Sequence, residues 1–229
     1  MRVLLEYMIG DRVRFISHLD FMRTIQRTIR RAGIPVAYSE GFNPHPKLSF
    51  GLPLPVGVTS SAEYMDIILS SPMDTEETKD LLNTHLPRGI AVTAAVGISP
   101  SAPSLMSLIK RADYRITLDT ALPGLESGIQ SFLQQAEIPY DKPGKKGVNR
   151  INIRDSVFSV EAGRDARREI LVSMKTGGSS SVKPEVIAEK IAELAGVEAH
   201  VKMELTIHRT GLYMHYDGRW VTPLMLKEG

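Results

Sequence analysis

Apolar residues dominate residues 2–9 and predict a β-strand. Ser17 can then cap a helix, because Asp20 stands where the acid of a capping box belongs. Gly33 ends this helix. Its apolar residues recur at helical spacing: Met22, Ile25, Ile29 and Ala32. The pattern next predicts extended segments over 35–38, 48–54 and 64–69, a helix over 74–86 and a strand over 90–98. This order, β-α-β-β-α-β, is that of a ferredoxin-like unit.

The second half repeats the order of elements without an obvious repeat of sequence. A run of Ser, Pro and Ala over 99–104 predicts a linker. The pattern then predicts strands over 114–118, 150–161, 170–174 and 201–207, helices with Pro123 and Pro184 in their first turns, and a hairpin turn at Asp217-Gly218. We therefore predict an α+β chain of two tandem ferredoxin-like halves, residues 1–100 and 101–229, with a C-terminal β-hairpin in the second.

The composition excludes several kinds of chemistry. The 229 residues contain no cysteine, so this chain offers no disulfide, thiolate zinc site, cysteine nucleophile or ligand for an iron–sulfur cluster. Apolar runs are short and broken by Gly or Pro, and the first residues lack the apolar region of a secretory signal. We expect a cytoplasmic protein without a membrane partner and without a cofactor of its own.

Charge is distributed unevenly along the chain. Residues 1–50 hold eight Lys/Arg against four Asp/Glu, a net charge of +4. Residues 142–175 reach +5, whereas residues 56–141 carry −6. Two basic blocks in a nearly neutral chain indicate a localised anionic partner.

The first basic block contains an arginine face, which is defined by Arg23, Arg27, Arg30 and Arg31. Their spacing places them on a single arc of the first helix, opposite its apolar stripe. Guanidinium groups match phosphate oxygens in geometry and stay charged at any relevant pH, so this face predicts binding to a phosphate backbone. The alternative is a solvated face that Asp20 partly neutralises.

Two further segments are candidate contacts for nucleic acid. The loop over 39–47 is constrained by Gly and Pro residues, and it offers Phe42 for stacking with His45 and Lys47 as donors. Its alternative is a rigid connection with Phe42 in the core. The second basic block predicts a flexible loop that binds along a phosphate backbone with little selectivity for the base sequence. The alternative is a loop that is merely solvated. Its cations are Lys142, Lys145, Lys146, Arg150 and Arg154.

Four segments carry a family resemblance, and the longest is Tyr-Ser-Glu-Gly-Phe-Asn-Pro-His-Pro-Lys over 38–47. The others are Arg-Phe-Ile-Ser-His-Leu-Asp over 14–20, Arg-Arg-Ala-Gly-Ile-Pro over 30–35, and Leu-Pro-Leu-Pro-Val-Gly over 52–57, with Glu63-Tyr64 following. Together they resemble the bacterial radical SAM-linked family of unknown function. The resemblance implies a partner, since members are typically encoded beside or fused behind a cobalamin-binding type of radical SAM protein, often near ribosomal-protein and ribonuclease G genes.

Histidines are the remaining candidates for catalysis. His18 and His45 lie near the predicted phosphate surface and could act as acid and base in metal-free RNA cleavage. The tandem architecture also resembles that of the endoribonucleases that process CRISPR repeats, but no glycine-rich RNA-clamping signature stands near the C-terminus. The alternative for His18 is packing at the start of the helix. His200, His208 and His215 are more typical of exposed strand positions than of a zinc site.

The sequence thus favours an RNA- or ribonucleoprotein-binding accessory protein that works with a radical SAM partner enzyme. The first alternative is a metal-independent endoribonuclease that uses His18 and His45. The second is a protein-docking module for the radical SAM protein, without contact to RNA. Phosphate-binding and dinucleotide signatures are missing, as is the aromatic pattern of RNA-recognition motifs, so arginine and loop contacts would have to dominate.

Overall fold

The computed structural model describes residues 1–144, 147–177, 181–198 and 203–227. The described residues form an α+β fold with five α-helices and a large, mostly antiparallel sheet. The chain divides into two compact units, Met1–Ile109 with Gly211–Gly229, and Lys110–Thr210. This division differs from the predicted one, which places a boundary after residue 100 and the C-terminal hairpin in the second half. Within the described residues, no helix is both long and apolar enough to cross a membrane.

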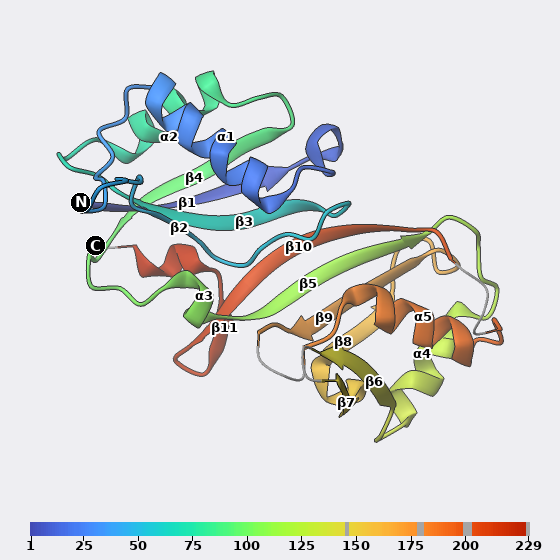
Figure 1. The fold of residues 1–229 in the computed structure, drawn as a ribbon. Helices are drawn as coiled ribbons and strands as arrows, with labels where there is room; N and C mark the ends of the chain where they lie inside the picture. Colours follow the sequence, from blue (N-terminus) through green and yellow to red (C-terminus); the bar gives the residue numbers. More distant parts are fainter. Residues whose placement is uncertain (145–146, 178–180, 199–202, 228–229) are drawn as a thin grey trace. The chain divides into compact units, whose positions relative to one another are not determined.

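The first unit carries its helices over an antiparallel sheet (Figure 1). Its strands have the order β4-β1-β3-β10, and β2 also pairs with β3. Only the part of β10 from Gly211 onward belongs to this unit. The helices α1 and α2 pack on the core face of these strands. The elements are β1 (Arg2–Ile9), α1 (His18–Arg31), β2 (Leu48–Phe50), β3 (Thr59–Ile68), α2 (Thr75–His85), β4 (Ile90–Ile98), α3 (Leu105–Leu108), β10 (Leu205–Tyr216) and β11 (Arg219–Val221).

Local chemistry sets both ends of α1, as predicted. Ser17 caps the helix, and its Oγ accepts a hydrogen bond of 3.1 Å from the backbone N–H of Asp20. Gly33 follows the helix with a φ of +67°, a conformation that a residue with a Cβ adopts at a cost. Phe21, Ile25, Thr28 and Ile29 are buried against the sheet. The helix therefore presents the opposite face to solvent.

A buried ion pair fixes the start of β1. Arg2 donates from Nε and Nη2 to the two carboxylate oxygens of Asp66 on β3, at 2.9 and 3.0 Å. Ser49 on β2 donates to the same carboxylate at 2.8 Å, and Arg2 also donates to the carbonyl of Ala102. This bidentate arrangement ties three strands to the segment that precedes α3.

The second unit contains β5 (Ile109–Leu118), whose first residue belongs to the other unit, and β9 (Glu169–Lys175) as its partner. Its strand order is β10-β5-β9-β8. The remaining elements are α4 (Leu125–Gln134), β6 (Pro139–Gly144), β7 (Gly147–Asn152), the short helix η2 (Ile153–Ser156), β8 (Val157–Ala162) and α5 (Pro184–Leu194).

Two predicted elements differ in detail from the structure. The predicted strand over 48–54 ends at Phe50, since Pro53 and Pro55 have no amide to donate to a neighbouring strand. Pro123 precedes α4 instead of lying in its first turn, because Gly124 is the N-cap.

The basic stretch over 142–150 forms a hairpin instead of a flexible loop. Strand β6 pairs with β7 in a regular antiparallel register in which Lys142 faces Asn149. Gly147 has a φ of +115°, which suits the turn side of this hairpin. The predicted C-terminal hairpin is confirmed, with Tyr216 opposite Arg219 and positive φ at Asp217 and Gly218, as a type I′ turn requires.

Gly128 controls how closely α4 approaches α5. A Cβ at this position would lie 2.5 Å from the carbonyl oxygen of Ile191 and 2.9 Å from the Cβ of Ala195. We expect Gly128→Ala to lower the free energy of unfolding by about 1–3 kcal/mol, because overpacking outweighs the gain in helix propensity. Urea denaturation measures this change. Gln130→Ala, on the exposed side of α4, is the control and should leave the stability nearly unchanged; equal stability of the two variants would contradict this packing.

Candidate nucleic-acid interface

The structure leaves all four residues of the arginine face exposed on α1. Arg23 pairs with Asp20 at 3.2 Å, and Arg31 donates to the carbonyl of His85 at 2.8 Å. Within the described part of the chain, Arg27 and Arg30 form no ion pair. These two guanidinium groups therefore keep their charge available to an external anion.

The pKa of the Asp20 carboxyl is lowered by its hydrogen bonds and by the charges at the start of this face. Its hydrogen bond from Ser17 Oγ, at 2.8 Å, lowers the pKa of the carboxyl most strongly. Desolvation partly opposes this effect, and the hydrogen bond and charge of Arg23 and then the charge of Arg27 lower the pKa further. The two arginines thus act together at this carboxylate.

The loop over 39–47 is closed by hydrogen bonds at its base. Ser39 N donates to the His45 carbonyl at 2.8 Å, and His45 N donates to Ser39 Oγ at 2.9 Å. Lys47 N donates to the Ala37 carbonyl at 2.7 Å, and Gly41 turns the chain with a φ of +111°. Such a network holds the loop in one conformation.

The same loop displays its aromatic residue to solvent. Phe42 is fully exposed, so the alternative that buries it in the core is wrong. His45 and Lys47 are exposed as well, and Tyr38 at the base of the loop is 44% exposed. The structure thus presents both an aromatic ring and donors on one constrained loop.

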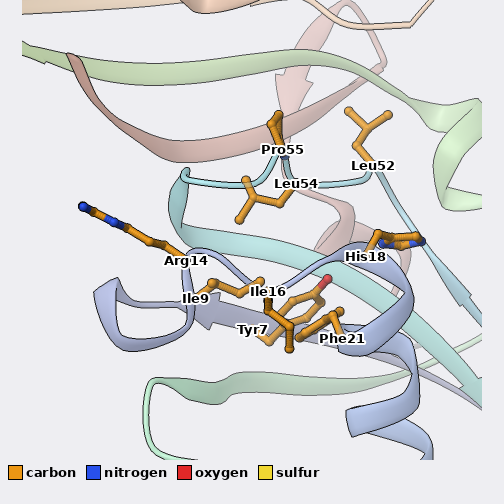
Figure 2. A pocket seen from close by; sticks show the side chains of 9 residues that line it. All are labelled: Tyr7, Ile9, Arg14, Ile16, His18, Phe21, Leu52, Leu54 and Pro55. Carbon is orange, nitrogen blue, oxygen red and sulfur yellow. The ribbon is translucent and has the colours of Figure 1, made fainter. Parts of the chain in front are cut away.

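A small pocket lies at the other end of this unit, where α1 begins (Figure 2). Its volume is about 20 Å³, which is room for about one water molecule. Tyr7 and His18 line it, and the side chain of Arg14 extends away from the other lining residues. The remaining lining residues are Ile9, Ile16, Phe21, Leu52, Leu54 and Pro55.

The two candidate catalytic histidines lie near different ends of β2. The ring of His18 packs edge-on against Phe50, with 5.4 Å between centroids. His45 belongs to the loop that leads into the first residue of β2, and the carbonyl of Lys47 at its end accepts a hydrogen bond of 2.9 Å from Ile68 N, the last residue of β3. The described contacts include none between His18 and His45. Packing at the start of the helix, the alternative for His18, accounts for its position.

The second basic block belongs to the other unit. Lys142 on β6 donates to the carbonyl of Ser181, and Arg150 lies exposed on β7. Arg154 lies on η2 and donates to the Val157 carbonyl at 3.1 Å. Lys145 and Lys146 lie outside the described residues, as does His200. Among the residues that are described, no group of three His, Asp or Glu side chains could hold a metal ion.

Sequence reasoning missed three exposed apolar side chains whose sequence neighbours line the pocket. We call them the apolar patch: Phe15, Leu19 and Val56. These side chains are 70%, 61% and 59% exposed. Phe15 lies next to Gly57, and the guanidinium of Arg14 lies 4.8 Å from the centre of its ring. No periodicity marks these residues as exposed, because Phe15 precedes the helix and Val56 lies in a Pro-rich segment.

The pKa of Asp20 tests the electrostatics of the arginine face. Since its pKa is lowered in the folded protein, these interactions favour folding above the ordinary Asp pKa and are lost as pH falls through the folded value. We expect Ser17→Ala to raise the pKa of Asp20 most and Arg23→Ala to raise it less, as followed by NMR titration of the carboxyl carbon. Arg115→Ala on β5 is the control. An unchanged pKa of Asp20 in both the Ser17→Ala and the Arg23→Ala variants would contradict the described contacts.

Comparisons with known proteins give a family but no activity. No curated protein matches the chain. A chain in a structure titled "Crystal Structure of a Cbf5-Nop10-Gar1 Complex" is similar at 12% sequence identity and a TM-score of 0.46. The match covers 92% of the present chain but 48% of that chain, so it spans about half of that protein's length. The family model described as "Uncharacterized protein conserved in bacteria (DUF2344)" matches residues 2–184, and the chain belongs to this family.

Proposed function

We propose that this protein binds RNA or a ribonucleoprotein through the arginine face of α1, as an accessory protein to a radical SAM enzyme. The observation that carries the proposal is the exposure of Arg27 and Arg30 without an ion pair among the described residues. A rigid helix that holds such groups on one face suits a row of phosphates. Arginine also stays charged at any relevant pH, so the attraction is permanent.

The loop over 39–47 supplies the second contact in this proposal. Its base is held by backbone hydrogen bonds, so Phe42 can receive an unpaired base at little cost in conformational entropy. Lys47 and His45 would contact phosphate or ribose beside it. In the other unit, Lys142, Arg150 and Arg154 are proposed to bind phosphates along the β6–β7 hairpin and η2.

The fold is compatible with such a role. The main sheet runs β4-β1-β3 in the first unit, where both β2 and β10 pair with β3, and it runs β10-β5-β9-β8 in the second. We interpret this order as two tandem ferredoxin-like halves, with the β6–β7 hairpin inserted into the second. The interpretation rests on strand order and on helices placed between the strands in sequence.

The radical SAM partner is proposed from the sequence resemblance. This chain contains no cysteine and cannot provide the thiolates of the partner's cluster. In this proposal the partner performs the chemistry, and the present chain positions the RNA or ribonucleoprotein for it.

A second candidate function is docking of the partner protein without RNA. The apolar patch favours it, because Phe15, Leu19 and Val56 expose large apolar side chains next in sequence to residues that line the pocket of the first unit. Cleavage of RNA gains no comparable support, since His18 and His45 lie at different ends of β2.

Salt dependence tests the arginine face. RNA affinity should fall steeply with salt, by about 0.7 log units per log unit of salt for each contact on a single strand. The double variant Arg27→Ala/Arg30→Ala should therefore flatten the slope by roughly 1.4 if each arginine makes one contact. Fluorescence anisotropy with a labelled oligoribonucleotide at several salt concentrations measures the slope.

The matched control removes two cations from β5, as Lys110→Ala/Arg115→Ala. Both positions are exposed and lie in the other unit, so this variant has the same net charge but an intact arginine face. Circular dichroism confirms that both variants are folded. An equal change of slope in the two variants would show a general charge effect and overturn the proposal. Absence of RNA binding at low salt would overturn it in favour of protein docking.

A further inference from the structure

A shallow groove, widely open to solvent, lies in the second unit, at the point where α4 ends and β8 begins. The labels α4, β8 and β9 locate this region in Figure 1. Side chains from four elements line it, although they are far apart in the sequence. The lining residues are Leu133, Gln134, Gln135, Ala136, Arg154, Asp155, Val157, Phe158 and Lys175.

The lining of the groove includes two cations and an aromatic ring. Arg154 comes from η2, and its hydrogen bond of 3.1 Å to the Val157 carbonyl holds the guanidinium at the groove. Lys175 ends β9, and its Nζ lies 6.0 Å from the centre of the Phe158 ring. Phe158 is 41% exposed. Two cations beside an accessible ring suit a ligand with both a phosphate and a planar group.

The lining also provides hydrogen-bond acceptors. The C-terminal end of α4 belongs to it, and the backbone carbonyls there carry the negative end of the helix dipole. Gln134 adds a side-chain amide, and Asp155 adds a carboxylate. A small inorganic anion could contact only the cations, whereas hydroxyl and amino donors of a larger ligand would bind these acceptors as well.

We propose that this groove binds a nucleoside phosphate. The phosphate lies between Arg154 and Lys175, the base stacks on Phe158, and ribose hydroxyls or base amino groups donate toward the end of α4. The same chemistry is presented by a free nucleotide and by one nucleotide of an RNA strand. The site belongs to the second unit and shares Arg154 with the RNA contacts proposed there, so it extends the proposed function; it does not involve the arginine face on α1.

The experiment uses the full chain with Arg27→Ala/Arg30→Ala, so that binding at α1 does not contribute. Isothermal titration at low salt compares adenosine 5′-monophosphate, inorganic phosphate and a short adenine oligoribonucleotide. We expect the mononucleotide or the oligonucleotide to bind clearly more tightly than inorganic phosphate. Binding of the mononucleotide identifies a free nucleotide as a sufficient ligand, and binding of the oligonucleotide alone identifies an RNA strand.

Variants of the groove then test the assignment. Phe158→Ala should weaken binding about tenfold through lost stacking, and Phe158→Tyr should retain it because the ring remains. Lys175→Ala should weaken binding, whereas Asp155→Asn should strengthen it by removing a negative charge from the groove. Lys190→Ala, on α5 outside the groove, is the control.

Three results would overturn the proposal. The first is that neither nucleotide ligand binds, and the second is that inorganic phosphate binds as tightly as the mononucleotide. The third is binding that Phe158→Ala and Lys175→Ala leave unchanged while circular dichroism shows folded protein. Because the α1 variant is the background throughout, none of these results bears on the arginine face.

Discussion

The pairing of β1 on both of its edges is the constraint that positions the rest of the first unit. β1 pairs antiparallel with β3 on one edge and with β4 on the other, and the Arg2–Asp66 ion pair is buried where β1 starts. A shift in the register of β1 would separate the two members of this pair and leave uncompensated buried charges. The ion pair therefore strongly disfavours such a shift. The pocket lies where β1 ends, and the loop over 39–47 attaches near its start, so one strand sets both positions.

The same sheet needs protection at the edge strand β4. Its sequence over Ile90–Ile98 contains no charged residue and no proline, which is typical of a strand that invites pairing with another chain. Asn83 of α2 satisfies the backbone hydrogen-bonding groups of this edge at Val92. Its side-chain amide donates to the Val92 carbonyl at 2.9 Å and accepts from the Val92 N–H at 2.8 Å. Lys227 forms an isolated antiparallel β-bridge with Ile98 at the other end of β4. A side chain and the C-terminal segment thus supply the partners that a neighbouring strand would provide.

Local signals in the sequence predicted the elements whose causes are local. The Ser17 cap, the arginine face and the Asp217-Gly218 turn depend on residues close together in the chain, and the structure contains all three. The β6–β7 hairpin escaped prediction because its residues are mostly polar on both faces, so no alternation reveals the pairing. The groove escaped for another reason: Gln134, Arg154 and Lys175 meet only through tertiary packing, and each alone is an ordinary polar residue.

The two proposed binding sites would gain their free energy in different ways. The arginine face lies on an exposed helix, where each charge is well solvated and attraction to RNA comes mainly from release of counterions. Such binding is fast and little selective for sequence. The groove combines charge with an aromatic ring and with acceptors at a helix end, so it can discriminate by the shape and hydrogen bonds of one nucleotide. A chain that carries both kinds of site could capture an RNA through the first and select a nucleotide through the second.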